Sequence, residues 1–120
     1  MNDFVIGVVG PCAAGKTTLI QSLRALGYHA KHIAQEHSYV PDMWQRIAHP
    51  DILIFLDVSY TLTLQRRMLD WTKDEYQEEL YRLRHARVHT HLYVNTDDLT
   101  PQDVLREVVA FVGRWREDPP

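Results

Sequence analysis

The residues best suited to chemistry lie together in one short segment, residues 10–17, which fits the pattern G-x-x-x-x-G-K-[ST]. Glycine lets a backbone adopt positive φ and wrap closely around an anion. Successive N–H groups, together with the start of a following helix, then point at phosphate oxygens. In such a loop Lys16 can reach the β- and γ-phosphates, and the Thr17 hydroxyl can hold Mg²⁺. The spacing therefore predicts a site for a nucleoside triphosphate and Mg²⁺.

The segments on both sides of this loop support the same interpretation. Residues 4–9 form an apolar run typical of a buried parallel strand. Residues 18–26 have the pattern of a helix that Gly27 closes. We expect the whole loop and the residue after it to bind the nucleotide: Gly10, Pro11, Cys12, Ala13, Ala14, Gly15, Lys16, Thr17 and Thr18.

The rest of the chain alternates between predicted strands and helices. Strands are predicted at residues 30–36, 52–56 and 91–95, and the second of these is the most continuously apolar run in the chain. Helices are predicted near residues 41–47, at 60–71 and 73–88, and from Pro101 onward with Thr100 as the N-cap. This order predicts an α/β fold of three layers, α/β/α, around a small parallel sheet of about four strands. Residues 1–118 are expected to form one domain and Pro119–Pro120 a frayed tail.

Several polar residues follow predicted strands, and ligands of such sheets bind where the strands end. Glu36 is a candidate general base, and the alternative is a solvated loop residue. Asp57 could hold a Mg²⁺ water or orient an acceptor, or it could cap the next helix. Asn95 begins the polar segment 95–98 at the same predicted edge. One site could therefore collect all of these groups.

Arginine is concentrated in one segment that includes Arg82, Arg84 and Arg87. Arginine stabilises the charge that develops on a transferred phosphoryl group, so we count Arg84 with Lys16, Glu36 and Asp57 as candidate catalytic residues. The alternative is a salt-bridged helix surface, which the i,i+4 spacing of Glu78 and Arg82 favours for Arg82.

Together these segments resemble the P-loop nucleoside and nucleotide kinases of the thymidylate and adenylate kinase type. The resemblance covers the loop at 10–17, the apolar strand and Leu-Asp-Val end within 50–59 with Arg66 in the next helix, the arginine-rich segment 82–87, and residues 91–97. It implies the fold of the P-loop-containing nucleoside triphosphate hydrolases, with ATP and Mg²⁺ as cofactors. It also implies that Arg82, Arg84 and Arg87 fold over the phosphates, and that Asn95 lies beside the adenine.

The chain departs from that family between the first helix and the Leu-Asp-Val strand. Only residues 27–50 lie there, which is room for one strand and a short helix at about 3.3 Å per strand residue, not for a separate acceptor domain. We therefore expect a kinase for a small hydroxyl or phosphate acceptor, with a homodimer as one way to complete the pocket. The alternatives are a non-catalytic or regulatory nucleotide-binding module, and an NTPase without a separate acceptor.

Composition limits the remaining partners. The net charge is -3, which gives no general basic surface for nucleic acid. No apolar run approaches membrane-spanning length, and the lone cysteine, Cys12, fits a reducing compartment. We expect a cytoplasmic protein with no membrane or nucleic-acid partner. Because Cys12 lies near a helix N-terminus, its thiol pKa is expected to be lowered.

Overall fold

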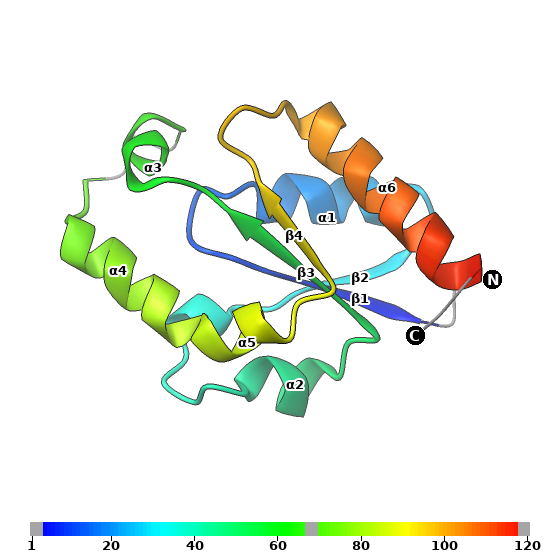
Figure 1. Ribbon diagram of the computed structural model, residues 1–120, viewed down its shortest axis with the longest axis horizontal. Helices are drawn as coiled ribbons and strands as arrows, with labels where there is room; N and C mark the ends of the chain where they lie inside the picture. The colour runs from blue at the N-terminus through cyan, green and yellow to red at the C-terminus, as the bar shows by residue number, and fades with distance from the viewer. Residues whose placement is uncertain (1–3, 67–69, 118–120) are drawn as a thin grey trace.

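The computed structural model describes residues 4–66 and 70–117, and its centre is a parallel sheet of four strands (Figure 1). The strands are β1 (Val5–Val9), β2 (His29–His32), β3 (Ile52–Asp57) and β4 (Leu92–Asn95). They lie in the order β2-β1-β3-β4, and each neighbouring pair is parallel. The strand order therefore reverses direction at β1, so that β1 and β3 are adjacent at the point where such sheets form a ligand crevice.

Helices occupy both faces of this sheet (Figure 1). They are α1 (Lys16–Ala25), the 3₁₀ turn η1 (Gln35–His37), α2 (Met43–Ala48), α3 (Tyr60–Arg66), α4 (Lys73–Arg82), α5 (Arg84–Val88) and α6 (Pro101–Glu117). The expected cap of the last helix is present, because Thr100 Oγ1 accepts a hydrogen bond from the Asp103 N–H at 3.1 Å.

Two apolar cores show which helices cover each face. Ile54 and Leu56 of β3 pack in the core that contains Leu23 of α1 and Val108 of α6. On the other face, Phe55 packs in a core made with residues of α2 and α5, such as Trp44 and Ala86. The alternation along β3 follows from the two-residue period of a strand. The protein is thus an α/β fold with a small parallel sheet, compatible with the predicted three layers.

Two predicted elements differ from the structure because of single buried residues. The strand predicted over 30–36 ends at His32, since the side chain of Gln35 turns inward and is fully buried. Its amide nitrogen donates to the Val40 and Arg82 carbonyl oxygens at 2.9 and 3.1 Å, and its oxygen accepts from the Trp44 N–H at 2.8 Å. These bonds hold the chain in a turn where a ladder was expected.

The predicted helix 73–88 is divided at Leu83, which lies between α4 and α5 and is fully buried. The break places Leu83 and Ala86 in the core beside Phe55. The helix predicted over 60–71 ends sooner than expected, because Trp71 is not helical; its predicted residues 67–69 lie outside the described residues. The predicted tail, Pro119–Pro120, lies outside them as well.

Among the helices of residues 4–66 and 70–117, none combines the length and apolar character needed to cross a membrane.

Candidate functional site

The loop at residues 10–17 joins β1 to α1 and is pressed against β3. Gly10 has φ 152°, and a Cβ atom added there would lie 2.0 Å from the Leu56 carbonyl oxygen. No side chain fits in that space. Gly15 (φ 97°) and Ala13 (φ 69°) also have left-handed backbones. Where left-handed and right-handed residues alternate in a loop, successive backbone N–H groups point to the same side and form a concavity that can bind an anion.

A cavity of about 510 Å³ opens beside this loop. Its walls come from the loop and the first turns of α1, from the segment after β2, and from the segments that follow β3 and β4. The lining residues are Cys12, Ala13, Ala14, Gly15, Lys16, Thr17, Thr18, Leu19, His32, Glu36, His37, Arg66, Thr96, Leu99, Pro101 and Val104. The cavity therefore contains most of the predicted loop contacts and Glu36, while Gly10 and Pro11 support the loop from outside the lining.

Lys16 and Glu36 form a buried ion pair at the centre of this site. Lys16 Nζ donates to Glu36 Oε2 at 2.9 Å and to the Pro11 carbonyl oxygen at 3.1 Å, and it also donates to the Gly10 carbonyl oxygen. The two residues are only 7% and 2% exposed. Glu36 Oε1 is buried without a hydrogen-bond partner within the described part of the chain. The sequence predicted both residues at the site, but not their pairing.

Arg66 and Thr96 connect the ends of three strands, and neither is among the catalytic or binding residues predicted from the sequence. The Arg66 guanidinium donates to Thr96 Oγ1 at 2.8 Å and to the Thr96 carbonyl oxygen. Thr96 Oγ1 also lies 3.2 Å from the Ala14 carbonyl oxygen and 3.0 Å from that of Asp57. The arginine noted in the helix after the Leu-Asp-Val strand was the available signal for Arg66. Nothing in the local pattern distinguished Thr96.

Asp57 is the last residue of β3, which pairs with β1, the strand that leads into the loop. The Asp57 side chain lies outside the cavity lining. It follows Phe55 on the face covered by α5, where it accepts a hydrogen bond from the Tyr93 hydroxyl and lies 3.8 Å from an Arg87 nitrogen. Burial, together with this bond to Asp57, raises the pKa of Tyr93. Asn95 Oδ1 accepts from the Asp97 N–H at 2.9 Å, and Asn95 is outside the cavity lining too. Glu36 therefore lines the cavity, whereas Asp57 and Asn95 do not.

The three candidate arginines of segment 82–87 also lie outside the cavity lining. Arg82 stacks over the Tyr39 ring at 4.4 Å and donates to the Glu36 carbonyl oxygen at 3.4 Å. Arg84 stacks over its neighbour Tyr81 at 3.9 Å, and Arg87 stacks over Tyr93 at 4.8 Å. Among the residues that the structure describes, the arginine that lines the cavity is Arg66.

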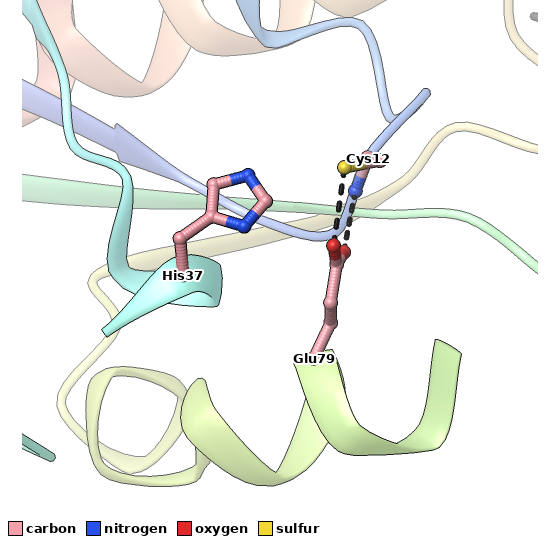
Figure 2. Close-up of side chains that lie close together, drawn as sticks. All are labelled: Cys12, His37 and Glu79. Carbon is pink, nitrogen blue, oxygen red and sulfur yellow. Dashed lines mark hydrogen bonds between the residues drawn. The ribbon is translucent and has the colours of Figure 1, made fainter. Parts of the chain in front are cut away.

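A hydrogen-bonded pair links the loop to α4 (Figure 2). The backbone N–H of Cys12 donates to Glu79 Oε1 at 3.0 Å, and the thiol donates to Glu79 Oε2 at 3.1 Å. Burial and the bond to Glu79 raise the Cys12 pKa to about 11. The expected lowering of the Cys12 pKa at a helix N-terminus is therefore wrong, because burial and the carboxylate beside the sulfur both oppose the thiolate.

Two histidines border the cavity near Glu36. Burial and the nearby Lys16 ammonium lower the pKa of His32. His37 is mostly exposed, and its Nε2 lies 3.8 Å from Glu36 Oε2.

No protein-family model matches this sequence, and a search of curated proteins finds no match. The resemblance to small P-loop kinases therefore rests on the residues named above.

Proposed function

We propose that the chain binds ATP with Mg²⁺ at residues 10–18 and transfers the terminal phosphoryl group to a small acceptor, on the fold of the P-loop nucleoside triphosphate hydrolases. The observation that carries the proposal is that Lys16 and Glu36 meet in one cavity, beside a loop in which three residues have positive φ. In this proposal Lys16 is the cation that binds phosphate, and Glu36, beside it in the cavity lining, is the carboxylate that accepts a hydroxyl proton.

Phosphate binding in this proposal uses the loop backbone and Lys16. The loop supplies N–H groups at the start of α1, where an anion is favoured. Lys16 Nζ now contacts carbonyl oxygens of the loop and Glu36, and phosphate oxygens would replace part of that set. The Thr17 hydroxyl is exposed on the cavity wall and would hold Mg²⁺, which supplies neutralising charge when bound.

Phosphoryl transfer in this proposal uses Glu36 as the base. An acceptor oxygen attacks the γ-phosphorus, the bond from that phosphorus to the β-bridging oxygen breaks, and ADP leaves. The acceptor proton passes to Glu36, whose Oε1 lacks a partner among the described residues. Arg66, which also lines the cavity, adds positive charge there. Asp57, Arg82, Arg84, Arg87 and Asn95 are outside this minimum set.

Calorimetric titration of ATP, ADP and GTP with and without Mg²⁺, followed by an ADP-release screen over a pool of small hydroxyl and phosphate compounds, tests the proposal. We expect Mg²⁺-dependent ATP binding and ADP release stimulated by one acceptor class. Glu36→Gln should keep binding and lose stimulated release, and the matched control Glu78→Gln on α4 should keep both. Absence of ATP binding by the folded wild-type chain would refute the proposal.

A nucleotide-binding module without transfer chemistry is the second candidate. It is favoured by the short path from β2 to β3, where the structure contains only η1 and α2 as helical elements. ATP binding with no stimulated release would support the module, while ADP release without any acceptor would indicate an NTPase.

A further inference from the structure

The hydrogen-bonded pair of Cys12 and Glu79 has a third neighbour, His37. A ligand atom from each of these side chains lies within 4.8 Å of the other two. The three residues come from separate elements, namely the phosphate loop, α4 and η1 (Figure 2). The phosphotransfer proposal gives none of these three side chains a role, so their convergence calls for another explanation.

Two of the three ligand atoms are already held in place. Glu79 accepts hydrogen bonds from both the backbone and the thiol of Cys12. The helix that carries Glu79 begins with a capping box, in which Thr72 Oγ1 accepts from the Glu75 N–H at 3.1 Å and Glu75 Oε1 accepts from the Thr72 N–H at 2.9 Å. The sulfur and the carboxylate are therefore positioned before any ion binds.

The imidazole of His37 can complete the set by a small movement. Ligand atoms of a tetrahedral Zn²⁺ ion lie roughly 3.4–3.6 Å apart, given bond lengths of about 2.0–2.3 Å. The Cys12 and Glu79 atoms already approach to 3.1 Å. The His37 side chain is 60% exposed, so its ring has room to close the remaining distance.

We propose that Cys12, His37 and Glu79 form a binding site for a thiophilic divalent cation, with Zn²⁺ as the best fit. One sulfur, one imidazole nitrogen and one carboxylate oxygen are ligands that Zn²⁺ accepts and Mg²⁺ does not favour. Binding replaces the S–H bond by a Zn–S bond and releases that proton to solvent, without any change of oxidation state. The thiolate and the carboxylate then balance both charges of the ion, and water fills the fourth position from the cavity.

Glu36 supplies a second observation that supports this site. It is a buried carboxylate with an unpartnered Oε1 among the described residues, and its Oε2 lies 3.8 Å from His37 Nε2. Metal-bound imidazoles usually donate their second N–H to a carboxylate, which orients the ring. An ion bound at His37 Nδ1 leaves Nε2–H facing Glu36.

The test uses the full metal-free chain titrated with Co²⁺ and then with Zn²⁺. We expect one equivalent of Co²⁺ to bind with an ultraviolet thiolate-to-metal charge-transfer band, and Zn²⁺ to displace it. Cys12→Ser, His37→Gln and Glu79→Gln should each weaken Zn²⁺ binding by about 100-fold or more, since loss of an outer-shell partner alone weakens a site by about 10–100-fold. The matched controls His29→Gln and Glu78→Gln should bind as the wild type does.

A second measurement does not require variants of Cys12 or Glu79. Zn²⁺ should slow alkylation of Cys12 at least about 10-fold in the wild type, Mg²⁺ should not, and the protection should be lost in His37→Gln. Co²⁺ binding without the charge-transfer band, or equal alkylation rates with and without Zn²⁺, would overturn the metal site. Neither readout involves ATP, so the two proposals can fail independently.

Discussion

Lys16 and Glu36 pair their charges at a place where both side chains are largely shielded from water. Removing one partner of a buried pair leaves the other uncompensated, which costs about 3–5 kcal/mol. We therefore expect Lys16→Ala to lower the free energy of unfolding by about that amount, measured by urea denaturation. Glu36→Gln should cost less, because Lys16 keeps its bonds to the Gly10 and Pro11 carbonyl oxygens.

The double variant Lys16→Ala/Glu36→Gln serves as the control for this prediction. It should be more stable than Lys16→Ala alone, because no buried charge is left unpaired. Simple addition of the two single losses would show that the ion pair does not couple these residues.

Gly10 and Gly15 have positive φ for different structural reasons. A methyl group on Gly10 would meet the Leu56 carbonyl oxygen, whereas nothing lies within 4 Å of one on Gly15. Gly10→Ala should cost roughly 2–5 kcal/mol, combining backbone strain and overpacking. Gly15→Ala should cost only about 1–2 kcal/mol from the backbone. Equal shifts of the urea midpoint would contradict the packing of the loop against β3.

At the scale of elements, the capping box of α4 fixes the helix that contacts the loop at residues 10–17 through Glu79. Thr72→Ala removes the acceptor for the Glu75 N–H and should destabilise the protein by about 0.5–2 kcal/mol. Amide hydrogen exchange should quicken in the first turn of α4. Lys73→Ala, at the exposed neighbouring position, should leave that exchange unchanged; an equal effect from both variants would argue against the cap.

The junction of β3 and β4 predicts a pH dependence. His91 Nδ1 accepts a hydrogen bond from the Leu53 N–H at 2.9 Å, and burial lowers the His91 pKa below 6.5. The unfolded chain then binds more protons than the folded chain below pH 6.5. The contribution of neutral His91 to the free energy of unfolding is therefore fully present above that pH. It is lost as the pH falls from 6.5 toward the lower pKa of His91 in the folded chain. His32, with its lowered pKa, adds a contribution of the same sign.

Urea denaturation at about pH 7.5 and about pH 5.5 checks this dependence. In His91→Asn the Oδ1 atom can accept the Leu53 hydrogen bond without titrating, so the decline should become smaller. An unchanged decline would assign the effect to other groups.

Local sequence patterns were sufficient to predict the helices and strands that contain a continuous apolar segment or follow a recognisable motif. Residues 52–56 are continuously apolar, and β3 occupies them; the loop pattern likewise predicted the start of α1 to within two residues. The end of α4 depends on Leu83, which packs beside Phe55 of the distant strand β3. The end of β2 depends on Gln35, which bonds to the nearby Val40 and Trp44 and to the Arg82 carbonyl oxygen 47 positions away, and an apolar pattern does not mark a buried glutamine.

The candidate site was predictable only in part, from the rule that the carboxyl ends of parallel strands lie at the same edge of the sheet. That rule predicted the proximity of Glu36 to the loop, but it does not say which face a side chain takes. Alternation from Phe55 would have assigned Asp57 to the face of α5. The partnership of Cys12 with Glu79 joins residues 67 positions apart, which only the tertiary structure brings together.

At the scale of the whole molecule, the proposed ligand should stabilise the fold, because its site joins the ends of several strands. A ligand at 100 times its dissociation constant adds about 2.7 kcal/mol to the free energy of unfolding. For a chain of this length, ATP with Mg²⁺ should therefore raise the melting temperature by on the order of 10 °C. Differential scanning calorimetry with Mg²⁺ alone as the control measures this shift. No shift at millimolar ATP would count against nucleotide binding.

The bonds of Lys16 to Glu36 and to the loop carbonyl oxygens have a further consequence for ligand selection. Glu36 is a competitor within the protein itself, since an anion that binds Lys16 must displace this carboxylate from the ammonium group. Chloride and other monovalent anions carry too little charge to displace the Glu36 carboxylate from Lys16, whereas a polyphosphate presents several negatively charged oxygens at once. We expect the chain to bind simple monovalent anions weakly at Lys16 and to bind ligands of high charge density selectively.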